Sequence, residues 1–417
     1  MKSILLQIRQ CNRVIFSNWL GKWAIFLMVI GLPFSTAMVS TGMILTVVAF
    51  FLRGNWHDNW QQIRSQPFIK GVGILLMLMS MGVLYSSAPW ALIRENYQDI
   101  AKLSLFVCCL PFIKSPAMKK QLLIIFTIAM SMLVLLSDLK YFGVIDIGRQ
   151  YARSAVFKDY QINALLYSVL VFLYCVLAHV YPNYKKLCFT VAALFTIQTI
   201  FVNEGRIGYG YISVLILYYG WVVDHWRGLL KSAAVLIGIF ALAYQCSPNF
   251  NSRMTLLFSE FQAYEQVSQN SPASLHLRLN FARNTIHLIE KKPWLGYGTG
   301  SFSTVYQQYS EQLGWAKTSN PHNYYLFITM QYGLLGLVFL LGFLVYLWYH
   351  TSRLPQLEKI LGRGLLLIYG FGCCYNSMLM DYTETIFFAL MMSLVYVVYQ
   401  PPVRTNTLPT LRHITVH

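Results

Sequence analysis

The sequence is dominated by recurring apolar runs of roughly 17–25 residues, the length that an α-helix needs to cross about 30 Å of hydrocarbon. Of the 417 residues, 56% are hydrophobic and only 11% are charged, whereas soluble domains carry about 25% charged residues. A membrane β-barrel would show short alternating segments instead. The sequence therefore predicts an all-α polytopic membrane protein.

Twelve segments are predicted to cross the membrane. They are residues 14–34, 36–52, 68–86, 99–113, 121–141, 160–181, 186–203, 206–223, 229–245, 322–349, 361–379 and 384–400. The first segment is followed directly by the second without a small-residue cleavage site, so it is expected to be an anchor and not a removed signal peptide. The chain divides accordingly into nine spans (1–245), a polar block (246–321), three spans (322–400) and a tail (401–417).

The net charge of +17 is unevenly distributed along the chain. Most lysine and arginine residues fall in the short loops and tails on the side of the N-terminus, where the only acids are Asp58, Asp224 and Glu358. Because positive residues concentrate in cytoplasmic loops, both termini are predicted to be cytoplasmic and the block at 246–321 to lie outside. This placement accounts for the basic excess, with attraction to anionic membrane lipids as a by-product, and it argues against a nucleic-acid partner.

The block at 246–321 is where a polytopic enzyme would place its chemistry. Within it, residues 273–290 are predicted to form an amphipathic helix, because one apolar stripe repeats with the helical period. The stripe consists of Leu275, Leu279, Ala282, Ile286 and Ile289. The glycine-containing run at 294–302 follows no strand and lacks GxGxxG spacing, so a flexible turn is preferred there over a phosphate-binding loop.

Two arginines occupy positions that a bound anion would explain. Arg206 lies at the outer N-terminus of the eighth span, where a cation opposes the helix dipole while free backbone N–H groups favour phosphate. Arg278 flanks the predicted apolar stripe, where an arginine is costly unless an anion meets it. The structural alternatives are pairing with Glu204 or snorkelling for Arg206, and pairing with Glu260 or Glu265 for Arg278.

His322 is the third candidate. It follows Pro321, and both fit the first turn of the tenth span with Asn320 as the N-cap. The helix dipole there would favour a neutral imidazole, which can accept a proton from a hydroxyl. The alternative is a histidine with only a structural role at the membrane interface. Asp381 and Glu384, before the last span, form a weaker candidate pair.

Other charged and metal-binding signals are weak. Arg149 and Arg153 lie in the outer segment 137–161 and are candidates for contact with an anionic lipid head group. Only Cys246 of the eight cysteines lies near the outer face, so no disulfide framework is expected. The sequence contains no HExxH motif or carboxylate cluster that would predict a metal site.

Several motifs together resemble those of the O-antigen ligase and polymerase superfamily of bacterial envelope enzymes. They are Gly205-Arg206-Ile207-Gly208-Tyr209, Ser274-Leu275-His276-Leu277-Arg278-Leu279, Lys292-Pro293-Trp294-Leu295-Gly296-Tyr297-Gly298, His322-Asn323-Tyr324-Tyr325-Leu326 and Gly333-Leu334-Leu335-Gly336. Their order, their spacing and the large outer loop before the His-Asn pair agree with that superfamily. The chain departs from it at Gly205, where the superfamily often has Ser or Thr before the arginine.

The resemblance implies a metal-independent glycosyltransferase without a cofactor, acting at the periplasmic face of a Gram-negative inner membrane. Arg206 and Arg278 would hold the pyrophosphate of an undecaprenyl-pyrophosphate-linked glycan donor and stabilise charge on the leaving group. His322 would orient or deprotonate the acceptor hydroxyl, with inversion at the anomeric carbon. Arg283 and Asn323 would be secondary contacts. The preferred member is the O-antigen ligase of lipopolysaccharide biosynthesis, whose acceptor is lipid A-core.

An O-antigen polymerase and a protein O-oligosaccharyltransferase are the alternatives within the superfamily. The total length and the single large loop in the C-terminal third favour the ligase. A lipid-linked glycan flippase or transporter is the alternative from another class, and it predicts charged residues at mid-membrane and broken spans in matching halves. The charges lie at the span ends and the polar block has no counterpart in the first half, so the sequence favours the enzyme.

Overall fold

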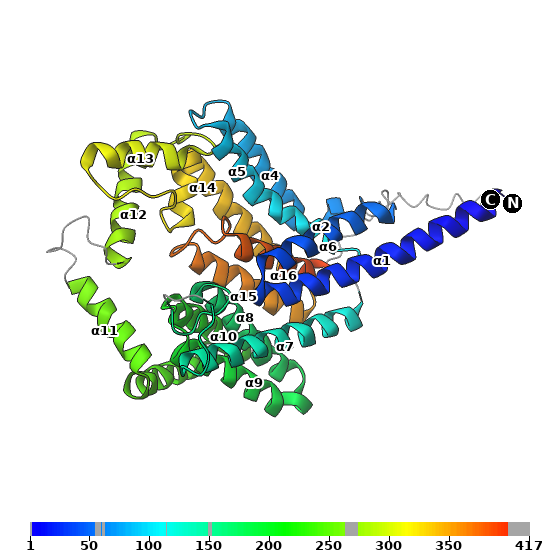
Figure 1. The fold of residues 1–417 in the computed structure, drawn as a ribbon, viewed down its shortest axis with the longest axis horizontal. Helices are drawn as coiled ribbons and strands as arrows, with labels where there is room; N and C mark the ends of the chain where they lie inside the picture. The colour runs from blue at the N-terminus through cyan, green and yellow to red at the C-terminus, as the bar shows by residue number, and fades with distance from the viewer. Residues whose placement is uncertain are drawn as a thin grey trace, which may run out of the picture.

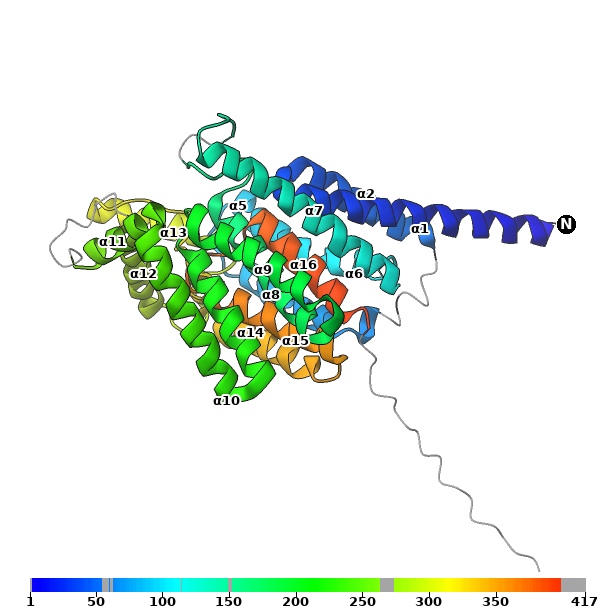
Figure 2. The same ribbon diagram turned by 90° about the horizontal axis from the view of Figure 1, so that it is seen from below.

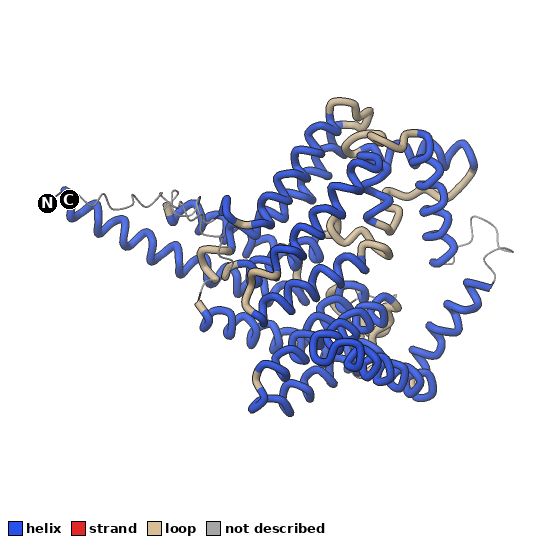
Figure 3. Tube along the Cα trace, turned by 180° about the vertical axis from the view of Figure 1, so that it is seen from behind, coloured by secondary structure: helices blue, strands red, loops and turns tan. Residues whose placement is uncertain are grey.

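The computed structural model describes residues 2–54, 60, 63–113, 115–148, 152–262 and 274–398, and side chains from Asn12 onward. Every regular element in these ranges is a helix (Figure 3). In chain order they are α1 (Lys2–Phe34), α2 (Thr36–Arg53), α4 (Pro67–Val83), α5 (Trp90–Ala101), η1 (Lys102–Ser104), α6 (Leu105–Cys109), α7 (Pro116–Tyr141), α8 (Tyr160–Val180), η2 (Pro182–Tyr184), α9 (Lys185–Ile197), η3 (Gln198–Val202), α10 (Ile207–Cys246), α11 (Pro248–Gln262), α12 (Ser274–Lys291), α13 (Ser301–Leu313), α14 (Tyr324–Thr351), α15 (Gln356–Gly372) and α16 (Tyr382–Tyr396). The predicted tail at 401–417 lies outside the described residues.

Seven helical segments in the described ranges are long and apolar enough to cross a membrane. They are Asn12–Phe34, Thr36–Arg53, Pro116–Tyr141, Tyr160–Val180, Pro182–Val202, Ile207–Cys246 and Tyr324–Thr351. Two shorter helices, Pro67–Val83 and Tyr382–Tyr396, are also apolar. These findings confirm the all-helical class and a multi-pass arrangement, while the predicted number of twelve spans is not reproduced by length and hydropathy.

Three of the predicted spans differ in form from the expectation. Residues 99–113 are not one helix, because α5, η1 and α6 divide them into short pieces before Pro111. The 40 residues of α10 contain the eighth and ninth predicted spans, which are separated by non-helical backbone at Asp224 and His225. The two halves of α10 approach so closely that a Cβ on Gly220 would lie 2.3 Å from the Gly228 carbonyl oxygen. The element is therefore a tight helical hairpin beside α8 and α9 (Figure 2).

The loops that are predicted to lie outside meet at one end of the molecule, which we call the loop end. Three hydrogen bonds tie these loops together, namely Asn203 Nδ2 to Tyr160 O (3.0 Å), Asn249 Nδ2 to Val202 O (3.2 Å) and Thr299 N to Gly82 O (3.2 Å). The helices α11, α12 and α13 occupy this end, opposite the beginning of α1 (Figure 1). The segments that are predicted to be cytoplasmic contact one another elsewhere, as the Lys119–Glu358 pair at 2.8 Å illustrates.

The amphipathic helix expected at 273–290 is present as α12, but its buried face is not the predicted one. The buried side chains are Phe281 and Leu288 together with three polar residues, His276, Asn284 and Thr285. Asn284 donates to the Tyr306 hydroxyl at 3.1 Å, and Thr285 donates to the Phe281 carbonyl at 2.6 Å. Because these polar groups find partners inside the protein, the helix can turn them inward, and Ile286 of the predicted stripe is 46% exposed.

The glycine-containing run after α12 is pinned against α14. The backbone N–H groups of Tyr297, Gly298 and Gly300 donate to Met330 O, Gln331 O and Gln331 Oε1, at 3.0, 2.8 and 2.5 Å. Since protein acceptors occupy these donors, the run does not offer them to a phosphate. The run forms turns, as the sequence analysis preferred, but they are packed against the protein, and Thr299 is fully buried.

Gly333 makes this close packing feasible, and we predict that Gly333→Ala destabilises the protein by about 3 kcal/mol. Gly333 has φ +66° and ψ −167°, and an added Cβ would lie 2.1 Å from the carbonyl group of Trp294. Thermal unfolding in detergent measures the effect. Gly342→Ala, also in α14 and with nothing within 4 Å of an added Cβ, is the matched control and should not destabilise. Equal unfolding midpoints for the two variants would contradict the pinning.

Candidate functional site

Arg206 lies at the N-cap position of α10, at the loop end. Its Nη1 contacts Glu260 Oε2 of α11 at 3.1 Å, and the Glu260 side chain is 7% exposed. Glu204, the partner considered from the sequence, pairs instead with Arg253 at 3.5 Å. The helix N-terminus, Arg206 and the buried acid therefore form one local charge arrangement in which the arginine is partly neutralised.

Arg278 lies on α12 and reaches across to the connection between α15 and α16. Its Nη1 donates to the backbone carbonyl of Tyr375 at 3.4 Å. No carboxylate forms an ion pair with it among the described residues, and Glu265 lies outside them. Burial lowers the pKa of the Arg278 guanidinium, and the nearby charge of Arg206 acts in the same direction. The two arginines therefore lie in one electrostatic environment.

His322 is not in the first turn of α14, which corrects the sequence prediction. The helix begins at Tyr324, and its N-cap is Asn323, whose side chain accepts from the N–H of Leu326 at 3.0 Å. Asn320 instead accepts from the backbone N–H of His322 at 2.8 Å. The sequence placed the cap three residues too early, because Asn-Pro-His-Asn offers two asparagines that can each cap. His322 itself has φ +52°, a left-handed conformation that is uncommon for residues other than glycine.

The His322 imidazole is partly buried and stacks on Phe281 of α12, with ring centroids 6.3 Å apart. Burial lowers the pKa of His322, the positive charge of Arg278 lowers it further, and a hydrogen bond with the Asn376 side chain acts in the opposite direction. The neutral ring predicted from the helix dipole is thus favoured here by burial and a neighbouring cation. The charge of Arg278 therefore acts on His322, and the charge of Arg206 acts on Arg278.

The connection between α15 and α16 completes the site, and the sequence did not indicate it. Its residues 373–377 contact the segment 320–324 and Arg278. Cys373 O accepts from Tyr324 N (2.8 Å), Cys374 O from Asn323 Nδ2 (3.0 Å) and Tyr375 O from Arg278, while Ser377 Oγ donates to Asn320 Oδ1 (2.6 Å). These partners are about 50–100 positions apart in the chain, so no local pattern could reveal them.

The acidic pair Asp381 and Glu384 lies next to this connection. Asp381 Oδ2 accepts from Asn376 Nδ2 at 2.9 Å, and burial raises the pKa of the Asp381 carboxyl. Glu384 is 5% exposed. Lys158, which the sequence analysis did not single out, is also buried and donates to Thr383 Oγ1 at 3.3 Å. The weaker candidate pair thus borders the site through Asn376.

The secondary candidates are placed unequally. Asn323 uses its side chain within the protein, at the α14 N-terminus and on Cys374 O. Arg283 and Arg153 are exposed, and no described contact connects either one to Arg278 or His322. Arg149 lies outside the described residues. The arrangement therefore gives direct support only to Arg206, Arg278 and His322.

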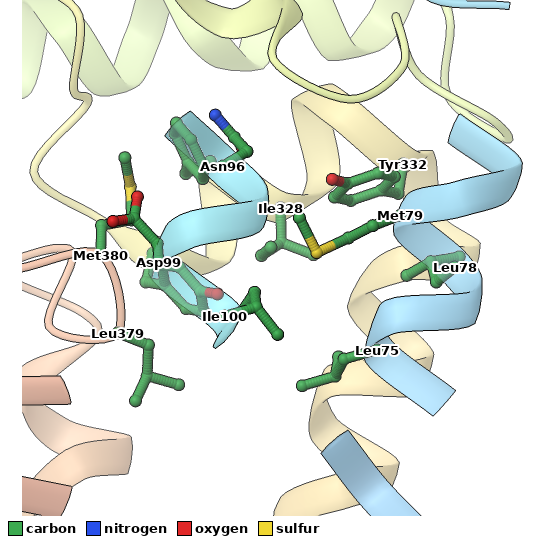
Figure 4. A pocket seen from close by; sticks show the side chains of 12 residues that line it. Leu75, Leu78, Met79, Asn96, Asp99, Ile100, Ile328, Tyr332, Leu379 and Met380 are labelled. Atoms are coloured by element: carbon green, nitrogen blue, oxygen red, sulfur yellow. The ribbon is translucent and has the colours of Figure 1, made fainter. Parts of the chain in front are cut away.

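An apolar pocket lies between α4, α5, α14 and the residues before α16 (Figure 4). It encloses an empty volume of about 370 Å³, which includes open solvent, and its lining includes Met79, Ile100, Tyr332 and Met380. Asp99 reaches its wall but is paired with Lys102 at 2.6 Å. Among the described residues, no group of three His, Cys, Asp or Glu side chains is placed to hold a metal ion.

Comparison with protein families identifies the central part of the chain. Residues 190–341 match the model of the family described as O-antigen ligase. The match includes Arg206, Arg278 and His322 and ends before the connection at 373–377. It is consistent with the O-antigen ligase and polymerase superfamily, whose members are glycosyltransferase-like enzymes of lipopolysaccharide biosynthesis. A search of curated proteins found no match.

The electrostatics of the site predict that the pKa of His322 lies below its ordinary value of 6.5. A lowered pKa means that protonation, and loss of nucleophilic reactivity, occurs at a more acidic pH. The rate at which diethyl pyrocarbonate modifies the His322 peptide, followed by mass spectrometry from pH 4 to 8, measures this midpoint against N-acetylhistidine. Arg278→Gln removes a neighbouring cation and should raise the midpoint. A midpoint at or above that of N-acetylhistidine would be incompatible with the described surroundings.

Proposed function

We propose that this chain, whose residues 190–341 match the O-antigen ligase family, is an O-antigen ligase. It would move a polysaccharide from undecaprenyl pyrophosphate to a sugar hydroxyl of lipid A-core. The observation that carries the proposal is the convergence of Arg206, Arg278 and His322 at the loop end, from three elements far apart in the chain. Two cations and one neutral base suit the transfer of a group from a pyrophosphate to a hydroxyl.

The donor pyrophosphate is assigned to the two arginines. Arg278 is partly buried and has a carbonyl but no carboxylate partner among the described residues, so an anion would relieve the cost of its partial burial. A guanidinium can bind two phosphate oxygens at once. Arg206 adds positive charge at a helix N-terminus, which is itself a favourable phosphate site. Both cations would stabilise the charge that develops on the departing pyrophosphate.

The acceptor is assigned to His322. Its neutral ring would take the proton of the acceptor hydroxyl as the hydroxyl oxygen bonds to the anomeric carbon. The bond between that carbon and the pyrophosphate oxygen breaks in the same step, and undecaprenyl pyrophosphate leaves with its electron pair. Attack opposite the leaving group inverts the anomeric carbon. The reaction balances with the proton on His322, and it requires neither metal nor cofactor.

The cellular setting follows from the same proposal. The loop end would face the periplasm of a Gram-negative inner membrane, with both termini in the cytoplasm. The membrane lipids around the spans are suitable surroundings for a lipid-linked donor. An O-antigen polymerase would use the same donor chemistry, so the acceptor distinguishes the two functions.

We predict that Arg206→Ala, Arg278→Ala and His322→Ala each reduce transfer by on the order of 100-fold or more, because each removes a group that acts in the transition state. Lipopolysaccharide gels of a deletion strain carrying each variant measure the outcome. Core without polymer, with lipid-linked polymer accumulating, supports a ligase, whereas core with a single repeat unit indicates a polymerase. Arg227→Ala and His179→Ala, at exposed positions outside the site, are the controls. Normal polymer on core in the three site variants would reject the proposal.

The orientation is testable with natural cysteines. Cys246 and Cys374 are exposed, whereas Cys109, Cys175 and Cys188 are buried. Both exposed cysteines lie at the loop end, which corrects the expectation that only Cys246 would lie near the outer face. We expect a membrane-impermeant maleimide to label Cys246 and Cys374 in intact spheroplasts, as judged by peptide mass spectrometry. Labelling of these two cysteines only after membrane disruption would place the loop end in the cytoplasm.

A further inference from the structure

The connection at 373–377 contacts both Arg278 and the segment 320–324. Its five residues make these contacts in two ways. Three of them, Cys373, Cys374 and Tyr375, present backbone carbonyls to Tyr324 N, Asn323 Nδ2 and Arg278 Nη1. The other two, Asn376 and Ser377, act through their side chains and are buried at 9% and 0% exposure. So many contacts from one short turn indicate that it positions the residues it contacts, in addition to joining α15 to α16.

The carbonyls follow from the position of the turn at the C-terminus of α15, which ends at Gly372. Carbonyl groups at and just beyond the C-terminus of a helix lack intrahelical partners, and they carry its negative partial charge. A cation at this end is therefore stabilised. Arg278 is placed there, so the negative end of α15 orients the guanidinium without neutralising it as a carboxylate would.

The two side chains converge on His322. Ser377 Oγ donates to Asn320 Oδ1 at 2.6 Å, and the same oxygen accepts from the His322 backbone N–H at 2.8 Å. The Asn376 side chain interacts with the imidazole and raises its pKa, and it donates its Nδ2 to Asp381 Oδ2 at 2.9 Å. The bond to Asp381 holds the Asn376 side chain in place beside His322. The left-handed backbone of His322 needs such support, because that conformation is unfavourable for histidine.

We propose that the turn 373–377 is the positioning element of the site, in which Asn376 and Ser377 set the orientation of the His322 ring and the Tyr375 carbonyl sets that of Arg278. The proposal rests on the proposed function, since it gives His322 the role of base. It assigns roles to residues outside the part of the chain that matches the family. Asn376 and Ser377 touch neither donor nor acceptor in this account and act through His322.

Asn376→Ala should lower kcat by about 10- to 100-fold, the loss typical of a misoriented catalytic group, with little change in KM for the donor. The assay uses purified protein, the lipid-linked glycan that accumulates in the deletion strain, and the lipopolysaccharide core of that strain. Asn251→Ala is the matched control, because the Asn251 side chain also donates its Nδ2 within the protein, to Tyr244 O at 3.1 Å, but lies on α11 and has no contact with His322 among the described bonds. Its kcat should equal that of the wild type.

The pH profile separates positioning from a loss of folding. The Asn376 side chain favours the charged ring, whereas burial and Arg278 oppose it. Asn376→Ala should therefore move the acid limb of kcat to lower pH. Asn376→Asp adds a negative charge beside the ring, in a region that also contains Asp381 and the Asp99–Lys102 pair, and should move the limb to higher pH. A variant that is only less stable would lower the yield of active protein and leave the limb in place.

A double-mutant cycle tests the arm through Ser377. Ser377→Ala and Asn320→Ala each break the same relay to His322, so the double variant should lose no more kcat than the worse single variant. The positioning role would be overturned if the kcat losses of the two single variants multiply in the double variant. It would also be overturned if the Asn376 and Ser377 variants keep the wild-type kcat and an unshifted acid limb. If Asn376→Ala does not fold, the cycle alone decides. Should His322→Ala retain transfer, the proposed function fails first, and the two failures are thereby distinguished.

Discussion

The site depends on a partly buried positive charge that the protein compensates only in part. Arg206 has an acid partner in Glu260, whereas Arg278 has the Tyr375 carbonyl at the end of α15. A buried cation without a counter-ion is costly, and a helix C-terminus offsets that cost by a partial charge only. A full carboxylate partner would compete with a phosphate for the guanidinium. The carbonyl instead holds Arg278 in place and leaves it attractive to an anion, and the same cation helps to keep His322 neutral.

This dependence explains why the site uses elements from so many parts of the chain. The arginines come from α10 and α12, the histidine precedes α14, and the supporting turn follows α15. The helices fix the distance of each element from the membrane, because their lengths are set by the apolar core. The polar segments at the helix ends can then adopt non-helical conformations. His322 with its left-handed backbone is such a segment, held by Asn320 and Ser377.

The sequence predicted what repeats locally and missed what does not. Long apolar runs gave most of the helices correctly, and the isolated arginines and the histidine were singled out because each is unusual in its own surroundings. The stripe on α12 was placed on the wrong face, because Asn284 and Thr285 find internal partners that no helical pattern records. The break of residues 99–113 and the cap at Asn323 were missed since competing local signals were equally strong. The turn 373–377 has no signal, because its partners lie up to 97 positions away.

The polar block must also be held rigidly against the spans, and the glycine run does this. Arg278 lies on α12. The run at 294–300 follows α12 in the chain and is hydrogen-bonded to α14. Were that run flexible, Arg278 could drift relative to His322, and a displacement of about 1 Å is enough to impair a catalytic arrangement. The backbone bonds of Tyr297 and Gly298 to Met330 and Gln331 prevent this, and the non-helical Gly333 lets Trp294 approach α14 closely enough to form them. The glycines of this run thus contribute to the candidate site indirectly, by fixing the position of Arg278.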